Sequence, residues 1–337
     1  MATISDVARR AGVSRTTVSR VLNHPETVAE EKRARVLAAI EELGYRPNVS
    51  ARNLRRGAFG VLALCVGDVS QPFHGQLTKA VQKAAEKHGY SVLLYDLDNR
   101  SDRLTAFLEG LPHRGVDGVL IATADDLTAP AVRSAIGAVL EAGVFVVSTG
   151  TAVDDSAVPA IVSDNTAMGA EATRHLLDQD LWPVAFLGGR RSSTLSAELR
   201  AGYLTACRRA GRAPQNWMYL SGAFQSEPAR RAVVRLLQER PEVRALVAAN
   251  APMAVGAMRA AGELGLRIPE DLAVVCCEDV ELSMYTSPPL TAVALDLEEL
   301  GGRAVDTLVA VLAGEKADRA TRIPHHLVVR ESSLTGA

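Results

Sequence analysis

The sequence predicts a small all-α helix-turn-helix headpiece followed by a larger α/β body with two parallel-sheet lobes. The pattern of residues 3–23 predicts two short capped helices on either side of a glycine turn. From Val61 onward, short apolar runs alternate with amphipathic helical patterns, which is typical of parallel strands covered by helices on both faces. About 280 residues follow the headpiece, and this length suits two domains of ordinary size rather than one small core.

The first helix of the headpiece is expected to begin after Thr3. The Thr3 hydroxyl suits an N-cap, and Asp6, three residues later, supplies the returning carboxylate of a capping box. Apolar residues follow at helical spacing, namely Ile4, Val7, Ala8 and Ala11. The helix should stop at Gly12, because glycine readily adopts a positive φ.

The second helix carries the residues that point to DNA. Ser14 suits its N-cap, and the apolar stripe is formed by Val18, Val21 and Leu22. The opposite face and the leading end project five polar side chains, Arg15, Thr16, Thr17, Ser19 and Arg20. Short hydroxyls suit phosphate oxygens and guanidinium groups suit guanine N7 and O6. The alternative is an ordinary surface helix, on which the same residue types also occur.

A third helix is expected from about Glu30 to Leu43, and Gly44 ends it. Asn48 then suits the cap of a short hinge helix that holds one leucine, Leu54, among the arginines Arg52, Arg55 and Arg56. A leucine flanked by cations suits a minor-groove wedge, which unstacks a base step while the arginines hold phosphates. The alternative is a basic linker with an incidental leucine.

The stretch Ile4–Asn23, followed by Gly44-Tyr-Arg-Pro-Asn48, closely resembles the headpiece of the LacI/GalR family of bacterial transcription regulators. The resemblance implies that residues 1–46 are the headpiece, that residues 47–57 are the hinge helix and linker, and that residues 58–337 are an effector-binding and dimerisation domain. It also implies roles for most of the DNA-binding candidates. The residues implied to contact base edges are Arg15, Thr16 and Arg20, those implied to contact the DNA backbone are Thr3, Ser14, Thr17, Ser19 and Asn23, and the implied wedge is Leu54. Asn48 and Arg52 are DNA-binding candidates because of their place beside Leu54.

One position of the headpiece departs from the family pattern. The third helix usually opens with a capping serine or threonine, and this chain has Ala29 there. Loss of this N-cap costs roughly 1 kcal/mol of stability at most, so the headpiece fold is still expected.

The charge is distributed unevenly along the chain. Residues 1–60 hold 11 lysines and arginines against 6 aspartates and glutamates, whereas the remainder holds 26 against 33. A basic headpiece can meet phosphate while an acidic body avoids nonspecific binding. The overall charge of −2 conceals this division.

Several functional classes are excluded by what the sequence lacks. No apolar run reaches the ~20 residues that span a bilayer, and no secretory h-region precedes the headpiece, so a cytoplasmic, nucleoid-associated protein without membrane contact is expected. The four cysteines show no metal-ligand spacing. Neither a P-loop, a dinucleotide fingerprint nor a nucleophile elbow occurs. No catalytic residue, metal or cofactor is therefore expected, and the chain is not expected to be an enzyme.

The body resembles that of the same family, which is similar to periplasmic sugar-binding proteins with a ligand cleft between two Rossmann-like lobes. That resemblance implies a first lobe of about residues 58–160 and 291–320, and a second lobe of about residues 161–290 and 321–331. Ligands of open parallel sheets bind beyond the carboxyl ends of the strands. The effector-binding candidates are Gln71, Phe73, His74, Thr123, Thr149, Asp164, Arg190, Leu199, Arg200, Phe224, Asn250 and Glu278.

The cleft candidates depart from the family pattern more than the headpiece does. An arginine usually stands where this chain has Leu199, and Arg200 is displaced by one residue, about 100° around a helix. Thr149 and Ala251 replace usual aspartates, and the usual Gly-Phe-Asp-Asp becomes Cys276-Cys277-Glu278-Asp279. Paired Asp and Arg forks suit polyols, so their loss argues against a typical free sugar. A small atypical effector and a cleft that binds nothing both remain open.

The sequence therefore predicts a homodimeric repressor of metabolic or transport genes that binds a palindromic operator and responds to a small ligand in the cleft. The chain ends at Ala337 without a leucine-heptad segment, so a dimer is expected rather than a tetramer. One alternative is the same regulator under the control of a protein corepressor or of no ligand. A solute-binding protein is the alternative from another class, but it would need export and has no use for residues 1–57.

Overall fold

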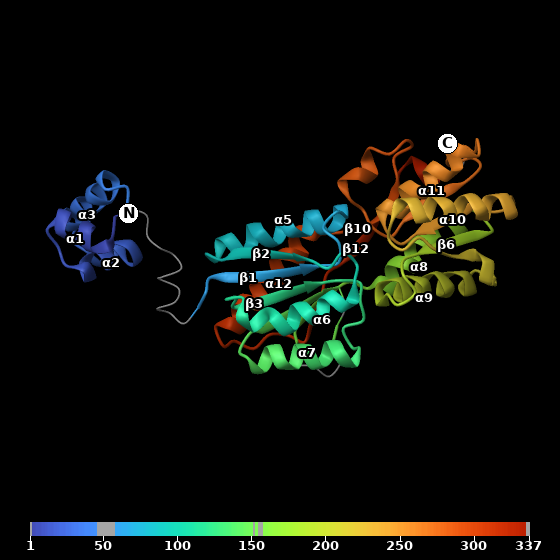
Figure 1. Cartoon of the computed structure of the whole chain (residues 1–337). Helices are drawn as coiled ribbons and strands as arrows, with labels where there is room; N and C mark the ends of the chain where they lie inside the picture. Colours follow the sequence, from blue (N-terminus) through green and yellow to red (C-terminus); the bar gives the residue numbers. More distant parts are fainter. Residues whose placement is uncertain (1, 46–57, 151, 154–157, 335–337) are drawn as a thin grey trace. The chain divides into compact units, whose positions relative to one another are not determined.

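The computed structural model describes residues 2–45, 58–150, 152–153 and 158–334, and the hinge assigned to residues 47–57 lies outside this range. The chain separates into two compact units, Met1–Gly60 and Val61–Ala337. The first unit is helical and the second is built on two sheets (Figure 1). The expected fold class, a helical headpiece with an α/β body of two parallel-sheet lobes, is confirmed.

The headpiece consists of α1 (Ile4–Ala11), α2 (Arg15–Asn23), the 3₁₀ turn η1 (Pro25–Thr27) and α3 (Glu30–Glu42). The Thr3 hydroxyl accepts the Asp6 N–H at 3.3 Å while the Thr3 N–H donates to the Asp6 carboxylate at 3.0 Å, so the expected capping box is present. Gly12 ends α1 at φ +63°, a conformation that costs glycine little.

The core of the headpiece is small and entirely apolar. Buried side chains from all three α-helices meet in it, namely Val7, Ala8, Ala11, Val18, Val21, Val36 and Ala39. Ala29 stands at the N-cap of α3 and makes no side-chain cap hydrogen bond. The first-turn amides of α3 therefore lack the side-chain acceptor that stabilises the starts of α1 and α2.

The first lobe of the body is a parallel sheet with the strand order β11-β5-β4-β3-β1-β2. Its strands are β1 (Val61–Val66), β2 (Ser91–Asp96), β3 (Gly118–Ala122), β4 (Phe145–Gly150), β5 (Ala160–Val162) and β11 (Ala320–Arg322). Its helices are α5 (Pro72–Lys87), α6 (Ser101–Gly110), η2 (Leu111–His113), α7 (Pro130–Glu141) and α12 (Leu297–Leu312).

Both faces of this sheet are buried. Along β1, Leu62 and Leu64 pack toward α5 and α12, whereas Ala63 and Cys65 pack toward α6 and α7. Successive strand residues point to opposite faces, so a strand buried on both sides reads as the continuous apolar run seen in the sequence. The segment with α12 lies with this lobe although it comes from near the end of the chain (Figure 1).

The second lobe has the strand order β12-β10-β9-β8-β6-β7, and β12 alone pairs antiparallel with its neighbour among the described strands. Its strands are β6 (Val184–Gly188), β7 (Tyr219–Ser221), β8 (Ala245–Ala248), β9 (Ala273–Cys276), β10 (Thr291–Leu295) and β12 (His325–Val328). Its helices are α8 (Asn165–Leu177), α9 (Thr194–Arg209), η3 (Asn216–Met218), α10 (Ser226–Glu239), α11 (Ala251–Glu263), η4 (Glu281–Met284) and η5 (Glu331–Ser333).

Two glycines allow α8 and α9 to pack closely. A Cβ atom on Gly202 would lie 2.0 Å from the Thr166 carbonyl oxygen, and one on Gly169 would lie 2.2 Å from the Leu199 carbonyl oxygen. Both positions therefore require the absence of a side chain. This close contact places the backbone of Leu199 against α8 and fixes the wall of the second lobe that faces the cleft.

The expected lobe boundaries need three corrections. Residues 291–295 were assigned to the first lobe, but they form β10, which pairs with β9 and β12 in the second sheet. The return to the first lobe begins at Asp296, directly before α12. The ends of β5 and β11 also lie two residues beyond the assigned boundaries, because both strands pair within the first sheet as far as Val162 and Arg322. The chain therefore crosses between lobes at residues 163–164, 296 and 323–324.

Candidate functional site

Most DNA-binding candidates of the headpiece lie on α2 or at its N-cap. The Ser14 hydroxyl accepts the Thr17 N–H at 3.1 Å, so the N-cap fixes where the helix begins. Arg15, Thr16 and Arg20 are exposed, while Thr17 and Ser19 are half-buried. Thr3 is exposed at the start of α1, and Asn23 is the last residue of α2.

The arginines of the headpiece fall into two groups. Arg9 pairs with Asp6, Arg10 with Glu42 at 2.7 Å, and Arg33 with Glu30 at 2.6 Å. Arg15 and Arg20 make no ion pair with any residue that the structure describes. Their guanidinium groups are thus available to an external anion or base edge. The hinge candidates Asn48, Arg52 and Leu54 lie outside the described residues.

The cleft of the body encloses a cavity of about 110 Å³. It lies beyond the carboxyl ends of strands from both sheets and receives side chains from both lobes. Nine of the twelve effector candidates line it, namely Gln71, Phe73, His74, Thr123, Thr149, Leu199, Phe224, Asn250 and Glu278. The remaining wall is formed largely by residues of helices and late strands, including Asn165, Met168, Leu195, Val293 and Leu297.

Three effector candidates lie away from the cavity and have partners of their own. Asp164 caps α8 by accepting the Ala167 N–H at 2.9 Å, and it also pairs with Arg322. The Arg200 guanidinium lies over the Tyr219 ring, with Cζ 3.9 Å from the ring centroid. Arg190 reaches into the first lobe. These three residues therefore do not line the cavity, and their polar groups bind neighbouring elements.

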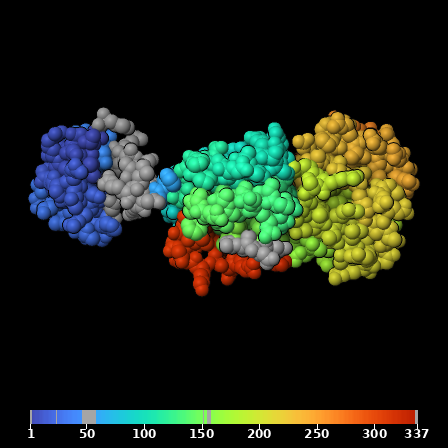
Figure 2. Space-filling model, turned by 60° about the horizontal axis from the view of Figure 1, so that its bottom comes forward, coloured from blue at the N-terminus to red at the C-terminus, as the bar shows by residue number. Residues whose placement is uncertain are grey.

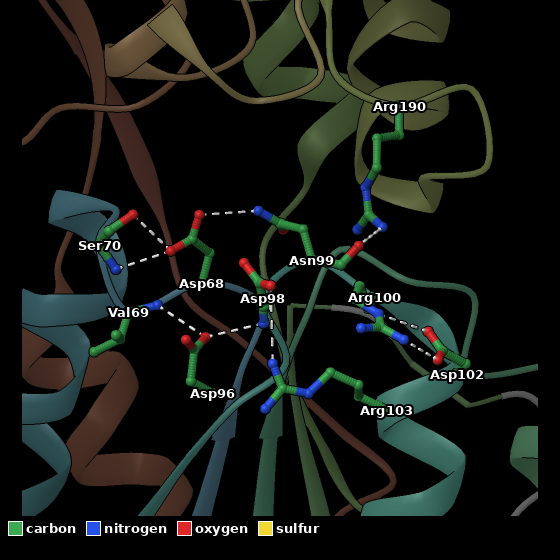
Figure 3. A network of polar contacts seen from close by, with 10 residues as sticks. All are labelled: Asp68, Val69, Ser70, Asp96, Asp98, Asn99, Arg100, Asp102, Arg103 and Arg190. Carbon is green, nitrogen blue, oxygen red and sulfur yellow. Dashed lines mark hydrogen bonds and ion pairs between the residues drawn. The ribbon is translucent and has the colours of Figure 1, made fainter.

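Arg190 joins the two lobes directly. Its Nη1 atom donates to the Asn99 carbonyl oxygen (Figure 3). Its Nη2 atom donates to Asp125 Oδ1 at 3.1 Å. A second contact crosses deeper in the cleft, where Asn250 Nδ2 donates to Gln71 Oε1 at 3.3 Å. In the space-filling view the green surface of the first lobe abuts the yellow surface of the second (Figure 2). The two lobes are thus closed on each other in this structure.

The loops of the first lobe that receive Arg190 are braced by carboxylates (Figure 3). Asp68 accepts from Asn99 Nδ2 at 3.1 Å, and Asp96 accepts the backbone N–H groups of Val69 and Asp98 at 3.2 and 3.1 Å. Asp98 and Asn99 both have φ +53°, a conformation that Asp and Asn tolerate better than most side chains. This backbone turn presents the Asn99 carbonyl oxygen to Arg190.

Burial changes the ionisation of several groups in and near the cavity. It raises the pKa of Glu278 to about 7, although the Ala251 N–H bonded to the carboxylate opposes this effect. Burial also lowers the pKa of His74 and raises the pKa of the Cys277 thiol to about 12. His74 and Cys277 are therefore neutral near pH 7, whereas the Glu278 carboxyl group is partly protonated and partly ionised.

Comparisons with known proteins agree over the whole chain. Residues 60–331 match the family described as periplasmic binding proteins and sugar binding domain of LacI family, and residues 3–48 match the bacterial regulatory proteins of the lacI family. The chain belongs to the LacI family. As a member of this family it is a DNA-binding transcriptional repressor with an effector-binding domain, and it is not an enzyme.

Individual relatives extend this match. The LacI-family chain is 32% identical to the ribose operon repressor of Halalkalibacterium halodurans, over 100% of this chain and 98% of the relative. It is also 32% identical to the repressor PurR of Pasteurella multocida, over 98% of each chain. A lac repressor dimer bound to operator and the anti-inducer ONPF matches with a TM-score of 0.85 at 28% identity, over 99% of both chains. A complex of the regulator CelR with cellobiose matches with a TM-score of 0.73 at 30% identity, over 98% of this chain and 100% of that one.

Leu199, for which the family resemblance led us to expect an arginine, is 1% exposed and lines the cavity. None of the described helices is long and apolar enough to span a membrane. No group of three or more potential ligands for a metal ion occurs in the part of the chain that the structure describes.

The sequence interpretation missed several residues that shape the cleft. The Asn99 carbonyl oxygen accepts from Arg190, and Arg330 donates two hydrogen bonds of 2.9 and 2.8 Å to Asp279. Asn99 lies in a loop that follows an apolar strand, so its position in the sequence could have indicated it. Arg330 carries no such signal, because it lies 51 residues from Asp279 and only the packing of the second lobe brings the two together.

Proposed function

We propose that this LacI-family protein binds a palindromic operator as a homodimer and that a small ligand in the cleft controls this binding. The observation that carries the proposal is the outer surface of α2, where Arg15 in the first turn and Arg20 in the last turn are exposed and free of ion pairs with described residues. A capped helix with unpaired guanidinium groups suits the major groove.

Within this proposal, the side chains of the headpiece divide into two roles. Arg15, Thr16 and Arg20 read base edges, because they are exposed at the leading end and outer face of α2. The phosphate contacts fall to Thr3, Ser14, Thr17, Ser19 and Asn23. Phosphate contacts set register and orientation, whereas base contacts carry the sequence information.

The hinge completes the DNA interface in the proposal. In this proposal Leu54 wedges into the minor groove at the centre of the operator, Arg52 holds a phosphate, and Asn48 also contacts the DNA. A pair of such wedges, one from each protomer, bends the DNA at its symmetry axis. The Leu54→Ala variant should keep nonspecific binding but reduce bending in a gel-phasing assay, and unchanged bending would remove Leu54 from this role.

Two exposed apolar surfaces support the homodimer. The first lies at η4 and the residue after it, where Leu282, Met284 and Tyr285 are 41%, 54% and 71% exposed beside a groove formed with α11. The second lies on the edge strand β2, where Leu93 and Leu94 are each 38% exposed. Unpaired strand edges and grouped apolar side chains favour association with another chain, and two-fold symmetry would bury both surfaces.

The lobes provide the route from ligand to DNA. A ligand in the cavity contacts both lobes and shifts the balance between the closed arrangement and a more open one. The proposed contacts are the nine cavity-lining candidates, and Arg190 acts through closure rather than through the ligand. Ligand and operator are then reciprocally coupled, typically by about 1 to 3 kcal/mol.

The proposal places the protein in the cytoplasm on the nucleoid, where it represses metabolic or transport genes. Genomic immunoprecipitation with sequencing should recover a palindrome, and footprinting should show that the full palindrome binds far more tightly than one half-site. Equal affinity for the half-site and the full palindrome would contradict the dimer. A protein partner that shifts operator affinity, when no small molecule does, would favour control by a corepressor.

A further inference from the structure

The cavity in the cleft contains one carboxylate, that of Glu278, without a compensating cation among the described residues. Two acidic residues, Glu278 and Asp279, line it, and no lysine or arginine is found among its described lining residues. The Arg330 guanidinium group donates one hydrogen bond to each carboxylate oxygen of Asp279. Glu278 is therefore the acidic group left for a ligand.

Glu278 is held in place but only partly satisfied. Its Oε1 atom accepts the Ala251 N–H at the start of α11, at 3.2 Å. Its other carboxylate oxygen has no hydrogen bond from any residue that the structure describes, and Glu278 makes no ion pair within that range. A carboxylate has about four acceptor sites, so most of its capacity remains for a donor in the cavity.

The other polar groups of the cavity also present mostly acceptors. Nδ1 of His74 lies 2.8 Å from the Asp68 carbonyl oxygen and 3.3 Å from the Asp68 backbone nitrogen. The shorter contact is to an oxygen that can only accept, and it favours the tautomer with the proton on Nδ1 and an acceptor at Nε2. The Thr123 hydroxyl donates to Asp125 at 2.7 Å, and the Thr149 hydroxyl donates to the Ile121 carbonyl oxygen at 3.3 Å. Their oxygens keep lone pairs for a ligand, while the Gln71 amide nitrogen remains as a donor.

The remaining wall is apolar, and the space is small. Phe73 and Phe224 come from opposite lobes, and Met168 and Leu199 come from α8 and α9. The cavity of about 110 Å³ is of the order of the ~150 Å³ cavities that hold a benzene-sized molecule. It therefore suits one ring or a short branched chain rather than a disaccharide or a nucleotide.

We propose that the effector of this cleft is a compact amine, whose ammonium group binds the Glu278 carboxylate while its apolar body packs between Phe73, Phe224 and Leu199. This inference rests on the proposed function, in which the cleft binds the controlling ligand. An ammonium group supplies up to three donors to an acceptor-lined site. A carboxylate or phosphate ligand would meet Glu278 with like charge and would find no lysine or arginine among the described lining residues.

The proposal predicts a proton linkage with a defined sign. The groups around Glu278 are Asp279, which is paired with Arg330, the neutral His74, and the thiols of Cys276 and Cys277, whose pKa values are raised by burial. Glu278 has a pKa of about 7 without ligand, and an ammonium group favours its ionised form. Amine affinity should therefore rise with pH through neutrality, whereas the affinity of an uncharged ligand should not.

The test is calorimetric titration of the full-length protein with cyclohexylamine, cyclohexanol and cyclohexanecarboxylate, from about pH 6 to about pH 8, where an alkylamine stays protonated. Cyclohexylamine should bind most tightly, and its affinity should rise with pH. E278Q should weaken amine binding about tenfold or more and remove the pH dependence, as expected for loss of a charge-assisted hydrogen bond. E278D should retain the rise with pH, and E239Q, which changes an exposed carboxylate at the end of α10, should match the wild type.

Three outcomes would overturn the proposal: equal or tighter binding of the carboxylate, unchanged amine affinity in E278Q, or binding of none of the three probes. Footprinting of the same preparations separates this inference from the proposed function. Operator binding without amine binding would overturn the amine and leave the repressor intact. Amine binding that leaves operator affinity unchanged would support the cleft ligand but contradict its control of DNA.

Discussion

The Arg190 guanidinium and the Asp125 carboxylate lie 3.1 Å apart and belong to different lobes of the body. Asp125 is 3% exposed and also accepts the hydroxyl groups of Ser101 and Thr123, at 2.8 and 2.7 Å. Arg190 Nε is buried and has no hydrogen-bond partner among the described residues. The contact therefore gains a charge-assisted bond but leaves one donor unsatisfied, so it stabilises closure only moderately.

Arg190→Ala should shift the ligand-free protein toward an open cleft. The loss of the charge-assisted bond should weaken closure by about 1.5 to 3 kcal/mol, and the first lobe should stay folded because Asp125 keeps two hydroxyl donors. Small-angle scattering should then report a larger radius of gyration for the ligand-free variant. Arg191→Ala, at the exposed neighbouring position, is the matched control. Identical scattering from Arg190→Ala and the wild type would show that the contact does not hold the lobes together.

Arg15→Ala and Arg20→Ala should each weaken operator binding by about 1 to 3 kcal/mol and relax specificity at one base position. The physical reason is the loss of a guanidinium group that is exposed and unpaired within the described headpiece. Binding to a library of operator variants measures both effects. Arg33→Ala, which removes an arginine already paired with Glu30, should change little. Equal weakening on all sequences would mean that the residue contacts only phosphate.

Ala29→Ser should stabilise the start of α3. Ala29 has extended backbone angles, φ −54° and ψ 138°, and offers no side-chain acceptor to the first turn. A serine hydroxyl there can accept a first-turn N–H and stabilise the helix by about 1 kcal/mol. Hydrogen exchange on the full chain should slow at the first amides of α3. Ala34→Ser, at an exposed position inside the same helix, should give no such protection. Faster exchange at the start of α3 in Ala29→Ser would contradict the cap.

Glu278 should make the unliganded protein less stable as pH rises from about 4.5 to about 7. The folded state holds the proton up to a pKa of about 7, while the unfolded state loses it near the ordinary value of 4.5. The folded state binds more protons in this window, so the free energy of unfolding falls with pH and then levels off. The Glu278 contribution is at most about 3 kcal/mol.

Denaturant unfolding of the wild type and E278Q at several pH values measures this contribution. The difference between the two free energies of unfolding isolates the contribution of Glu278, because His74 is present in both proteins. The lowered pKa of His74 has the opposite effect, since it makes stability rise with pH below the ordinary pKa of histidine. A stability difference that does not change over this window would show that the Glu278 pKa is not raised in the folded protein.

Much of the headpiece follows from its sequence because its structure is local. Thr3 and Asp6 form their capping box within one helical turn, Ser14 caps α2, and Gly12 ends α1. Each interaction joins residues no more than three or four positions apart, so spacing alone predicts it. The apolar runs of the body are likewise readable, since strands buried on both faces leave no polar alternation.

The sequence by itself therefore determined the helices of the headpiece, the alternation of strands and helices in the body, and the family to which both belong. Only the tertiary structure decided that β10 lies in the second lobe, that Arg190 pairs with Asp125 instead of lining the cavity, and that Glu278 remains without a cation among the described residues. These outcomes depend on side chains that packing brings together from distant parts of the chain. Local spacing cannot encode which lobe a crossover returns to, or how burial sets the charge of a carboxyl group.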